Sequence, residues 1–482
     1  MQLTARNSIL CFSCGVLFHY FFYNKGVGVS YPLYVFYLYL LFFLVVKNNK
    51  EKQTIFDYMM LGAVLFLSMN VALSSNLHFH VLNILLVPLL MFVHMIHSRR
   101  WDVKQWSNRL FVHSLFLTFF ESVGEFFKLF KVVQWVGKGF ATNERYQTIK
   151  KVGIGFLISV PLLWAVLFLL ISSDQQFELL LGRIPDYLYQ ANMGSIFFQI
   201  VLVLFVSFAI YAFFIVLARP LVFSGEQKQS IPIKMDKIII STILLLVNIV
   251  YLLYTVVQFT YFFNSDPASA SLNYTYAEYA RRGFTELTFV AVINLGILFV
   301  VTHLGNAETP TLPRIIKILL SSLVLFTFVM LASGFFRLSL YEQAYGYTYS
   351  RVLAHSFMIL LGMLLCIAMY KVFNERCKLL RAMFAVSLIG YVVINYVNID
   401  QFIVKKNLER YEATGKLDFD YLDSLSDDAI PLLVELQHDR MDDMLIVKYY
   451  ERQNDATTWQ SYNVSRERAK SKLKEWREER GS

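Results

Sequence analysis

Charged residues are scarce in this chain of 482 residues, since Asp, Glu, Lys and Arg together make up only 16% of it. A soluble globular domain carries about 25% charged residues, which excludes an ordinary soluble enzyme of this length. Cysteine is also rare, and the four cysteines are too scattered for a disulfide framework. By contrast, 56% of the residues are hydrophobic and 16% are aromatic. The composition indicates a polytopic membrane protein and excludes a disordered or collagen-like chain.

The sequence also lacks the common catalytic signatures. It has no phosphate-binding glycine loop, no G-x-S-x-G turn and no H-E-x-x-H pair. The histidine pairs at 78 and 80 and at 94 and 97 have no further ligands beside them, whereas zinc needs three or four. The sequence therefore predicts no metal site, no cofactor and no nucleic-acid partner. Whether the protein is an enzyme stays open, because a membrane-embedded transferase needs only a few acidic and arginine side chains.

Long apolar segments dominate the chain. A helix that crosses the hydrocarbon of a bilayer needs about 20 mostly apolar residues, because lipid cannot satisfy exposed backbone polar groups. Eleven segments meet or approach this length: 8–23, 31–46, 55–73, 77–96, 152–172, 195–218, 238–262, 284–302, 315–333, 352–370 and 379–397. The first two are the shortest. These segments predict an all-α protein, a polytopic transmembrane helical bundle of about 11 spans.

Lysine and arginine are distributed unevenly between the predicted loops. With the N-terminus in the cytoplasm, the cytoplasmic segments hold 24 of these residues and the external loops up to residue 397 hold 6. Cytoplasmic loops of membrane proteins carry such an excess. The bias predicts a multi-pass protein with a cytoplasmic N-terminus and, after eleven spans, an extracytoplasmic C-terminus.

A further apolar stretch, 110–136, is not counted as a span. If it crossed the membrane, every later loop would change sides and the charge bias would disappear. Its polar residues recur every three or four positions, which predicts an amphipathic helix lying in the cytoplasmic interface. A helix packed on the inner rim of the bundle is the alternative.

The chain divides into four predicted regions. Residues 1–97 hold the first four transmembrane helices, and 98–151 form a cytoplasmic or interfacial segment. Residues 152–397 hold the remaining seven helices, and 398–482 form a small helical tail outside the cytoplasm. The composition changes abruptly at the tail, which carries 14 basic and 18 acidic side chains. The tail has few core residues, so we expect it to lean on the bundle.

Several short motifs after residue 150 carry a resemblance to a known family. They are Ser173-Asp174 with Phe177, the run from Ala280 to Leu287, Phe336-Arg337-Leu338, Leu340-Tyr341, the run from Ala344 to Thr348, Asn398-Ile399-Asp400, Asn407, Arg410-Tyr411, Leu417-Asp418, Tyr421-Leu422 and Asp428-Ala429. Over roughly residues 150–435 the chain resembles an uncharacterised bacterial membrane family catalogued as domain of unknown function 4173. The resemblance implies a multi-pass protein of the bacterial plasma membrane and implies no activity.

Arginines and acids flank several predicted external helix ends, where basic residues are otherwise scarce. Arginine is suited to bidentate contacts with carboxylate or phosphate, and a carboxylate inside the membrane must be paired or line a wet cavity. The candidate ligand-binding residues are Asp174, Arg281, Arg282, Glu286, Arg337, Tyr341, Glu342 and Arg351. We expect them to lie together on the outer side, either as a pocket for an anionic group or as ties that hold helix ends together.

Three functional hypotheses follow. The first is a binding protein, and with a polar path a transporter, for an anionic or amphiphilic ligand at the outer face. The second is a membrane-embedded enzyme acting on a lipid-linked envelope substrate, with Glu286 or Asp174 as the base. The third is an envelope scaffold or sensor partner. The expected partners are the lipid bilayer, an anionic lipid or envelope precursor, and a membrane or envelope protein.

Overall fold

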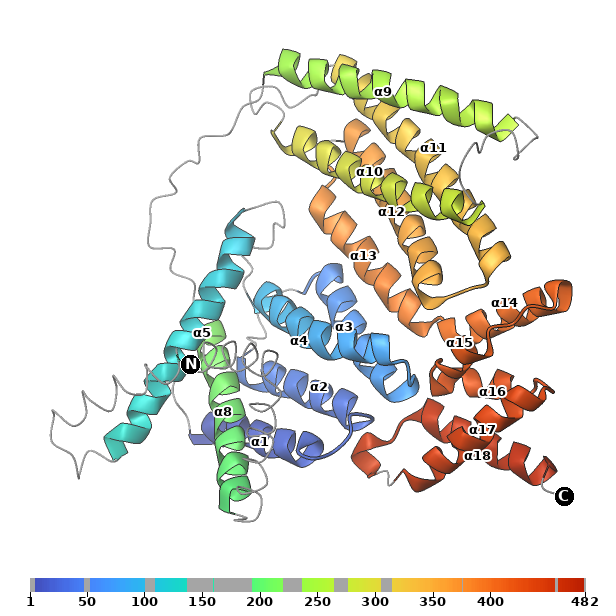
Figure 1. Cartoon of the computed structure of the whole chain (residues 1–482). Coiled ribbons are helices and arrows are strands. Elements are labelled where there is room, and N and C mark those ends of the chain that lie inside the picture. Colours follow the sequence, from blue (N-terminus) through green and yellow to red (C-terminus); the bar gives the residue numbers. More distant parts are fainter. Residues whose placement is uncertain are drawn as a thin grey trace. The chain divides into compact units, whose positions relative to one another are not determined.

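The computed structural model describes residues 5–46, 53–99, 109–136, 159, 193–219, 236–263, 276–304, 314–374, 376–455 and 458–480. These residues are helical with no strand, which confirms the predicted all-α fold. The membrane-type helices (Figure 1) are α1 Ala5–Phe22, α2 Ser30–Leu41 with a π-helical turn Phe42–Val46, α3 Ile55–Leu73, α4 Leu77–Arg99, α5 Arg109–Val136, α8 Met193–Ala218, α9 Lys237–Phe263, α10 Tyr276–Leu304, α11 Arg314–Tyr345, α12 Tyr349–Phe373 and α13 Leu379–Tyr396. The tail helices are α14 Ile399–Thr414, α15 Phe419–Asp423, the 3₁₀ turn Asp427–Ala429, α16 Ile430–Leu433, α17 Asp439–Asn454, the 3₁₀ turn Trp459–Ser461 and α18 Val464–Arg480.

Ten of the eleven predicted spans coincide with helices, and the other, 152–172, lies outside the described residues except for residue 159. Within the described part of the chain, eight helices are long and apolar enough to cross a membrane: α3, α4 and α8 to α13. The length and apolar composition of these helices identify a multi-pass membrane protein. The first two predicted spans are helical but shorter or less apolar, and α5 is not among the eight.

Two helices extend beyond the predicted spans. Helix α10 begins at Tyr276, ahead of the predicted start at 284, and α11 continues past 333 to Tyr345. The sequence placed Arg281, Arg282 and Arg337 at the edges of external loops, and all three lie within these longer helices. Their place at the outer side of the membrane stays a prediction. Charged residues end an apolar run, but arginine is a good helix former and does not end a helix.

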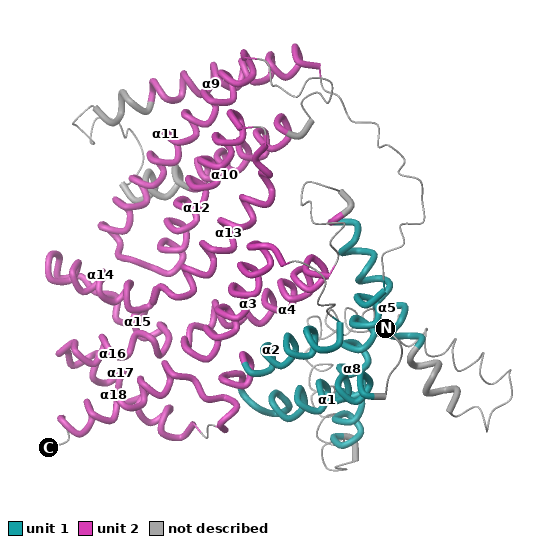
Figure 2. Tube along the Cα trace, turned by 180° about the vertical axis from the view of Figure 1, so that it is seen from behind, with its two compact units in different colours: residues 1–26, 33–51, 112–221 teal, residues 27–32, 52–111, 222–482 magenta. Residues whose placement is uncertain are grey.

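The chain folds into two compact units, each described by itself (Figure 2). The first contains residues 1–26, 33–51 and 112–221, and so holds α1, most of α2, most of α5 and α8. Helices α1 and α8 approach closely at Gly15, where an added Cβ would lie 2.2 Å from the Val203 carbonyl oxygen. Small residues allow such backbone contact between membrane helices. The Ser207 hydroxyl of α8 lies 3.2 Å from the Phe12 carbonyl of α1, to which it can donate across this contact.

The second unit contains residues 27–32, 52–111 and 222–482. Its bundle pairs α3 with α4 and with α13, and α11 with α9, α10 and α12. The helices around α11 pack through a core that includes Leu244, Leu298, Leu320 and Leu365. The boundaries of the four regions drawn from the sequence stay a prediction.

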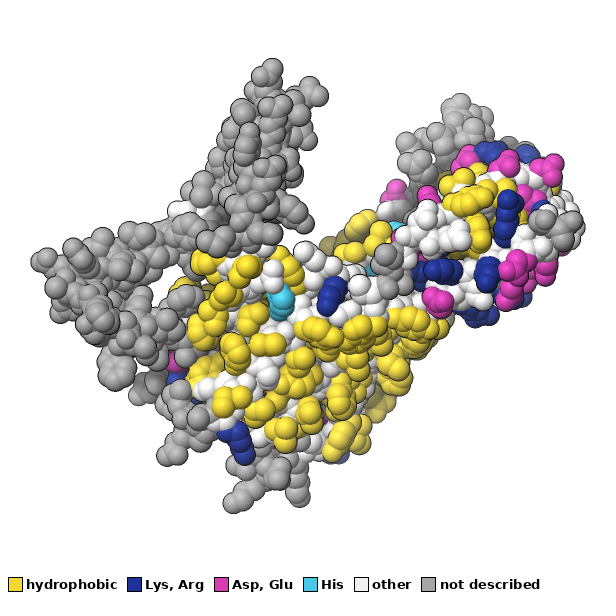
Figure 3. All heavy atoms as spheres, turned by 90° about the horizontal axis from the view of Figure 1, so that it is seen from below, with side chains coloured by type: hydrophobic (Ala, Val, Ile, Leu, Met, Phe, Trp, Pro, Cys, Tyr) yellow, Lys and Arg dark blue, Asp and Glu magenta, His cyan; other side chains and the backbone are white. Residues whose placement is uncertain are grey.

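The tail belongs to the second unit and has its own hydrophobic core, formed by residues such as Ile403, Leu445 and Leu473. Phe79 of α4 and Val352 of α12 belong to the same core, so the tail packs on bundle helices rather than standing alone. Figure 3 shows one face of the molecule, on which hydrophobic side chains form a broad area. The acidic and basic side chains gather at the end where the tail lies.

Candidate functional site

The structure describes only part of the predicted anion site. Asp174 and the side chains of Arg281 and Arg282 lie outside the described residues. Glu286, in α10, is exposed. Arg337 lies on α11 and is half-buried. The cluster as a whole therefore stays a prediction.

The remaining residues of that cluster, Tyr341, Glu342 and Arg351, lie near the turn between α11 and α12. The Arg351 guanidinium lies 4.2 Å from the centre of the Tyr341 ring, a cation–π contact. It also donates hydrogen bonds to the backbone carbonyls of Tyr345 and Gly346. These carbonyls end α11, where a cation interacts favourably with the helix dipole. Arg351 thus ties the two helix ends together.

Glu342 is the most deeply buried charged residue of the described cluster, with only 2% of its surface exposed. Its two carboxylate oxygens lie 3.2 and 3.1 Å from Nδ1 of His355, one helix away. The His355 Nε2 atom contacts the Phe335 carbonyl and the Ser339 hydroxyl. A buried carboxylate needs such a partner. The pair is a second tie between α11 and α12.

The tail reinforces the same turn. Two hydrogen bonds of 2.9 Å join Asn407 of α14 to the backbone of Tyr347. Oδ1 of Asn407 accepts from the Tyr347 N–H, and Nδ2 donates to the Tyr347 carbonyl. Arg410 donates to the Gln343 and Ala344 carbonyls at 3.1 and 2.8 Å. The motif residues of α14 therefore cap the end of α11. This turn uses its polar groups in contacts within the chain and leaves little for a ligand.

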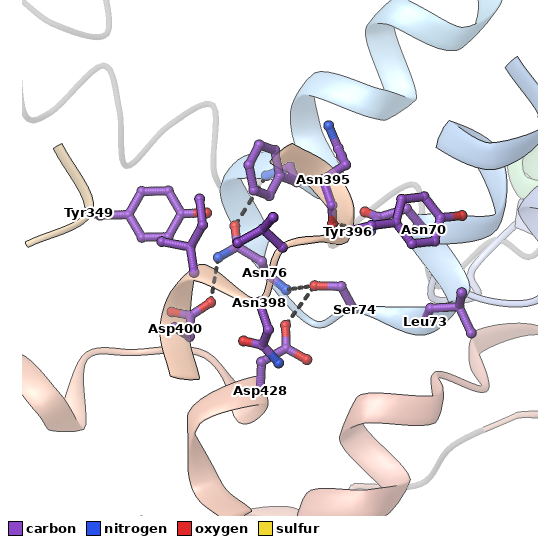
Figure 4. A pocket seen from close by; sticks show the side chains of 13 residues that line it. Asn70, Leu73, Ser74, Asn76, Tyr349, Asn395, Tyr396, Asn398, Asp400 and Asp428 are labelled. Atoms are coloured by element: carbon purple, nitrogen blue, oxygen red, sulfur yellow. Dashed lines mark hydrogen bonds between the residues drawn. The ribbon is translucent and has the colours of Figure 1, made fainter. Parts of the chain in front are cut away.

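A pocket of about 140 Å³ opens elsewhere in the same unit, between the α3–α4 loop, the α13–α14 junction and the start of α12 (Figure 4). A cavity of roughly 10–15 Å³ already holds one water molecule, so this pocket has room for several waters or a small polar group. Its lining residues are Asn70, Leu73, Ser74, Asn76, Phe79, Tyr349, Asn395, Tyr396, Val397, Asn398, Ile399, Asp400 and Asp428. It is the best candidate site in the described part of the chain.

Two buried carboxylates belong to this lining. Asp400, in the first turn of α14, is 3% exposed, and Asp428, in the 3₁₀ turn, is 7% exposed. Asp400 Oδ2 accepts hydrogen bonds from Nδ2 of Asn76 at 2.7 Å and from the Ser426 hydroxyl at 3.0 Å. Asp428 Oδ2 accepts from the Ser74 hydroxyl at 2.6 Å and from the Ser75 N–H at 3.2 Å. Figure 4 shows both side chains beside the α3–α4 loop.

Among the residues that the structure describes, no lysine, arginine or histidine lines the pocket. Burial raises the pKa of Asp400, and the nearby Asp428 carboxylate raises it further, while the hydrogen bonds from Asn76 and Ser426 act in the opposite direction. The contrast with Asp427 is clear, because its carboxylate pairs with Arg452 at 2.9 Å and lies 3.8 Å from Arg466. Asp427 thus has arginine partners, whereas its neighbour Asp428 lines the pocket.

Beneath the pocket, a group of buried asparagines joins three bundle helices. Nδ2 of Asn83 donates to the amide oxygens of Asn395 at 2.7 Å and Asn70 at 3.2 Å. Nδ2 of Asn70 donates to the Asn395 carbonyl at 2.7 Å, and the Tyr391 hydroxyl contacts Asn83 at 2.9 Å. Polar residues inside a membrane bundle are costly unless they are bonded. The network fixes α3, α4 and α13 below the pocket.

The sequence model of one protein family, described as "Domain of unknown function (DUF4153)", matches residues 61–436. The chain belongs to this family. The family number inferred from the motifs, 4173, is therefore wrong, although the family is again one of unknown function. No curated protein and no solved structure matches the chain.

The family match extends from within α3 to just beyond α16, so it includes every residue that lines the pocket. Sequence reasoning did not propose this pocket. Asp400 and Asp428 stood in the tail motifs as part of the family resemblance, without a role in a site. The signal that could have pointed to the site was the occurrence of acids in the motifs immediately after the last span.

Proposed function

We propose that this integral membrane protein binds a small polar ligand, or the polar head of an amphiphile, in the pocket between its bundle and its tail. The pocket itself supports the proposal most directly. It combines space for a polar group with two buried carboxylates whose hydrogen bonds come only from neutral groups. A buried charge without a charged partner is costly to folding, and such groups are concentrated at functional sites.

The location favours a ligand that comes from, or lies close to, the membrane surface. The pocket lies just beyond the last residues of α3 and α13, two of the apolar helices, and next to the charged tail. With the topology that the lysine and arginine bias predicts, this surface is the outer one. We therefore propose that the ligand binds at the outer face of a bacterial plasma membrane.

Transport is less well supported than binding. In α3, the buried residues between Asp57 and Ser68 are apolar: Met60, Ala63, Val64 and Leu67. A substrate path would need polar groups across this stretch. The enzyme and scaffold hypotheses rest on the sequence alone.

The full-length protein, purified in mild detergent, tests the proposal by native mass spectrometry. We expect a small molecule or lipid to remain bound to the wild type. Leu73→Trp, which introduces a large ring at the lining of the pocket, should release it. Leu85→Trp is the matched control, because Leu85 is an exposed leucine of α4 outside the pocket. Equal retention by both variants, or no bound molecule in the wild type, would contradict the proposal.

A further inference from the structure

We infer that the group recognised in this pocket is an organic ammonium, placed between the Asp400 and Asp428 carboxylates and the aromatic side chains of the lining. The inference rests on the proposed binding function and specifies its ligand class. It departs from the anionic ligand that the sequence suggested.

The first support for this inference comes from the carboxylate oxygens of Asp400 and Asp428. The hydrogen bonds of good geometry that the Asp400 and Asp428 carboxylates accept from the described residues all end on Oδ2. Neither Oδ1 atom accepts one from these residues, and neither is among the buried polar atoms that lack a partner. Both side chains are more than nine-tenths buried and line the pocket, and each keeps an oxygen on which no such bond ends.

Three of the four asparagine side chains of the lining direct Nδ2 to other groups of the protein. Nδ2 of Asn76 is bonded to Asp400, and its amide oxygen accepts from the Phe79 N–H. Nδ2 of Asn70 and Nδ2 of Asn395 donate to the Asn395 and Tyr391 carbonyls. An anion would meet two carboxylates and no cation here, which like-charge repulsion opposes. A ligand that donates hydrogen bonds or carries positive charge is complementary.

The aromatic residues narrow the choice to a cation. Phe79, Tyr349 and Tyr396 line the pocket, and the Phe79 and Tyr349 rings meet edge to face with their centres 6.3 Å apart. The Tyr349 hydroxyl is buried and has no hydrogen-bond partner of good geometry among the described residues. Aromatic rings beside carboxylates are a recurring way to bind ammonium groups, because the ring faces attract positive charge.

A metal ion fits less well. No group of three or more His, Cys, Asp or Glu side chains lies close enough to hold a metal in the described part of the chain. Calcium requires six to eight oxygen ligands, and two carboxylates with one free oxygen each supply only a fraction of them. An ammonium group needs only a few acceptors and tolerates ring contacts.

The ammonium could be a free solute or the head group of a lipid, and two experiments distinguish these sources. In the first, the dissociation constants of choline and ethanolamine are measured on the purified protein by calorimetry. The neutral analogue 3,3-dimethylbutan-1-ol, inorganic phosphate and Ca²⁺ are compared with them. In the second, the thermal unfolding temperature is measured in nanodiscs of phosphatidylglycerol with and without phosphatidylethanolamine.

We expect at least one ammonium source to bind, and Asp400→Asn and Asp428→Asn each to weaken it at least tenfold. Asp443→Asn, an exposed acid of α17 outside the pocket, should leave the affinity unchanged. Circular dichroism will confirm that the variants are folded. Binding in the nanodiscs alone would assign the ammonium to the lipid.

The inference is overturned if neither source binds, if the neutral analogue, phosphate or Ca²⁺ binds as well as choline, or if both aspartate variants keep full affinity. The proposed function would survive such a result if mass spectrometry had identified a bound molecule without an ammonium group. The two failures are therefore distinguishable.

Discussion

Asn76 donates a hydrogen bond of 2.7 Å to Asp400, although the two residues are 324 positions apart in the sequence. The bond joins the loop between two bundle helices to the first turn of the tail. Asp428 makes the same kind of connection to Ser74 in that loop. The walls of the pocket therefore come from both the bundle and the tail, and the pocket is complete only when the tail is docked.

The first prediction concerns Asp400 and pH. Its pKa is raised by burial, with Asp428, Tyr349 and Tyr421 close by, so the folded protein holds the proton more tightly than the unfolded chain does. The stability that this proton contributes is fully present below the ordinary pKa of 3.8 and is lost as the pH rises through the raised value. Asp400→Asn imitates the protonated form. We expect it to unfold at a higher temperature than the wild type at neutral pH, and the difference to shrink on acidification.

The measurement is the unfolding temperature of both proteins between about pH 4 and pH 8, the range in which a raised carboxyl pKa has its effect. Asp443→Asn should follow the wild type throughout. A constant difference between Asp400→Asn and the wild type across this range would show that the proton on Asp400 does not control stability.

A second prediction compares two glycines with positive φ. Gly346, at φ 86°, ends α11, and a Cβ there would lie 2.7 Å from the Asn407 Oδ1. Gly415, at φ 67°, ends α14 and faces open space. Alanine at either position adds backbone strain of about 1–2 kcal/mol. Only at Gly346 does it also displace Asn407, so Gly346→Ala should lower the unfolding free energy more than Gly415→Ala does.

Chemical denaturation of the purified protein measures the two values. Asn407→Ala combined with Gly346→Ala provides the control. Because the smaller side chain removes the clash, the double variant should lose less than the sum of the two single losses. Equal losses at the two glycines would show that Asn407 moves aside without cost.

The helices were largely predictable from the sequence, and the candidate site was not. The limits of α3 agree with the predicted span because Thr54 caps it and the apolar run ends at Leu73. Helix α11 was predicted too short, since Leu338 and Glu342 remain buried beyond the charged Arg337. Hydropathy detects contact with lipid, and it says nothing about a helix that continues in contact with protein.

The pocket could not be predicted because its residues are local features with distant partners. Asn398 and Ser426 were readable as caps, and both side chains do accept a backbone N–H of the next turn. Their sequence neighbours Asp400 and Asp428 meet Asn76 and Ser74 only through the packing of the tail. Sequence periodicity predicts which face of a helix is buried, but it does not predict which other segment covers that face.

A third prediction tests Glu342, a member of the predicted cluster. Its carboxylate is buried against His355, so Glu342→Gln replaces a charge-assisted contact with a weaker one. We expect a loss of about 1–3 kcal/mol in the unfolding free energy. Glu409→Gln is the control, because Glu409 forms an exposed pair with Lys406 on α14 and should leave the unfolding temperature unchanged. An unchanged stability in Glu342→Gln would mean that the pair does not hold α11 to α12.

The last prediction concerns the side of the membrane on which the tail and its pocket lie. The bias of 24 against 6 lysines and arginines and the count of eleven spans together place the C-terminus outside. Alkaline phosphatase fused after residue 482 should therefore be active, and green fluorescent protein at the same position should not fluoresce. A fusion after residue 108, immediately ahead of α5, should behave in the opposite way, because four spans precede it. If the C-terminal fusions gave the reverse result, the count of spans would be wrong by one. The segments to examine would then be the two short helical segments that begin the chain and the stretch 110–136. An ammonium ligand would in that case have to reach the pocket from the cytoplasm.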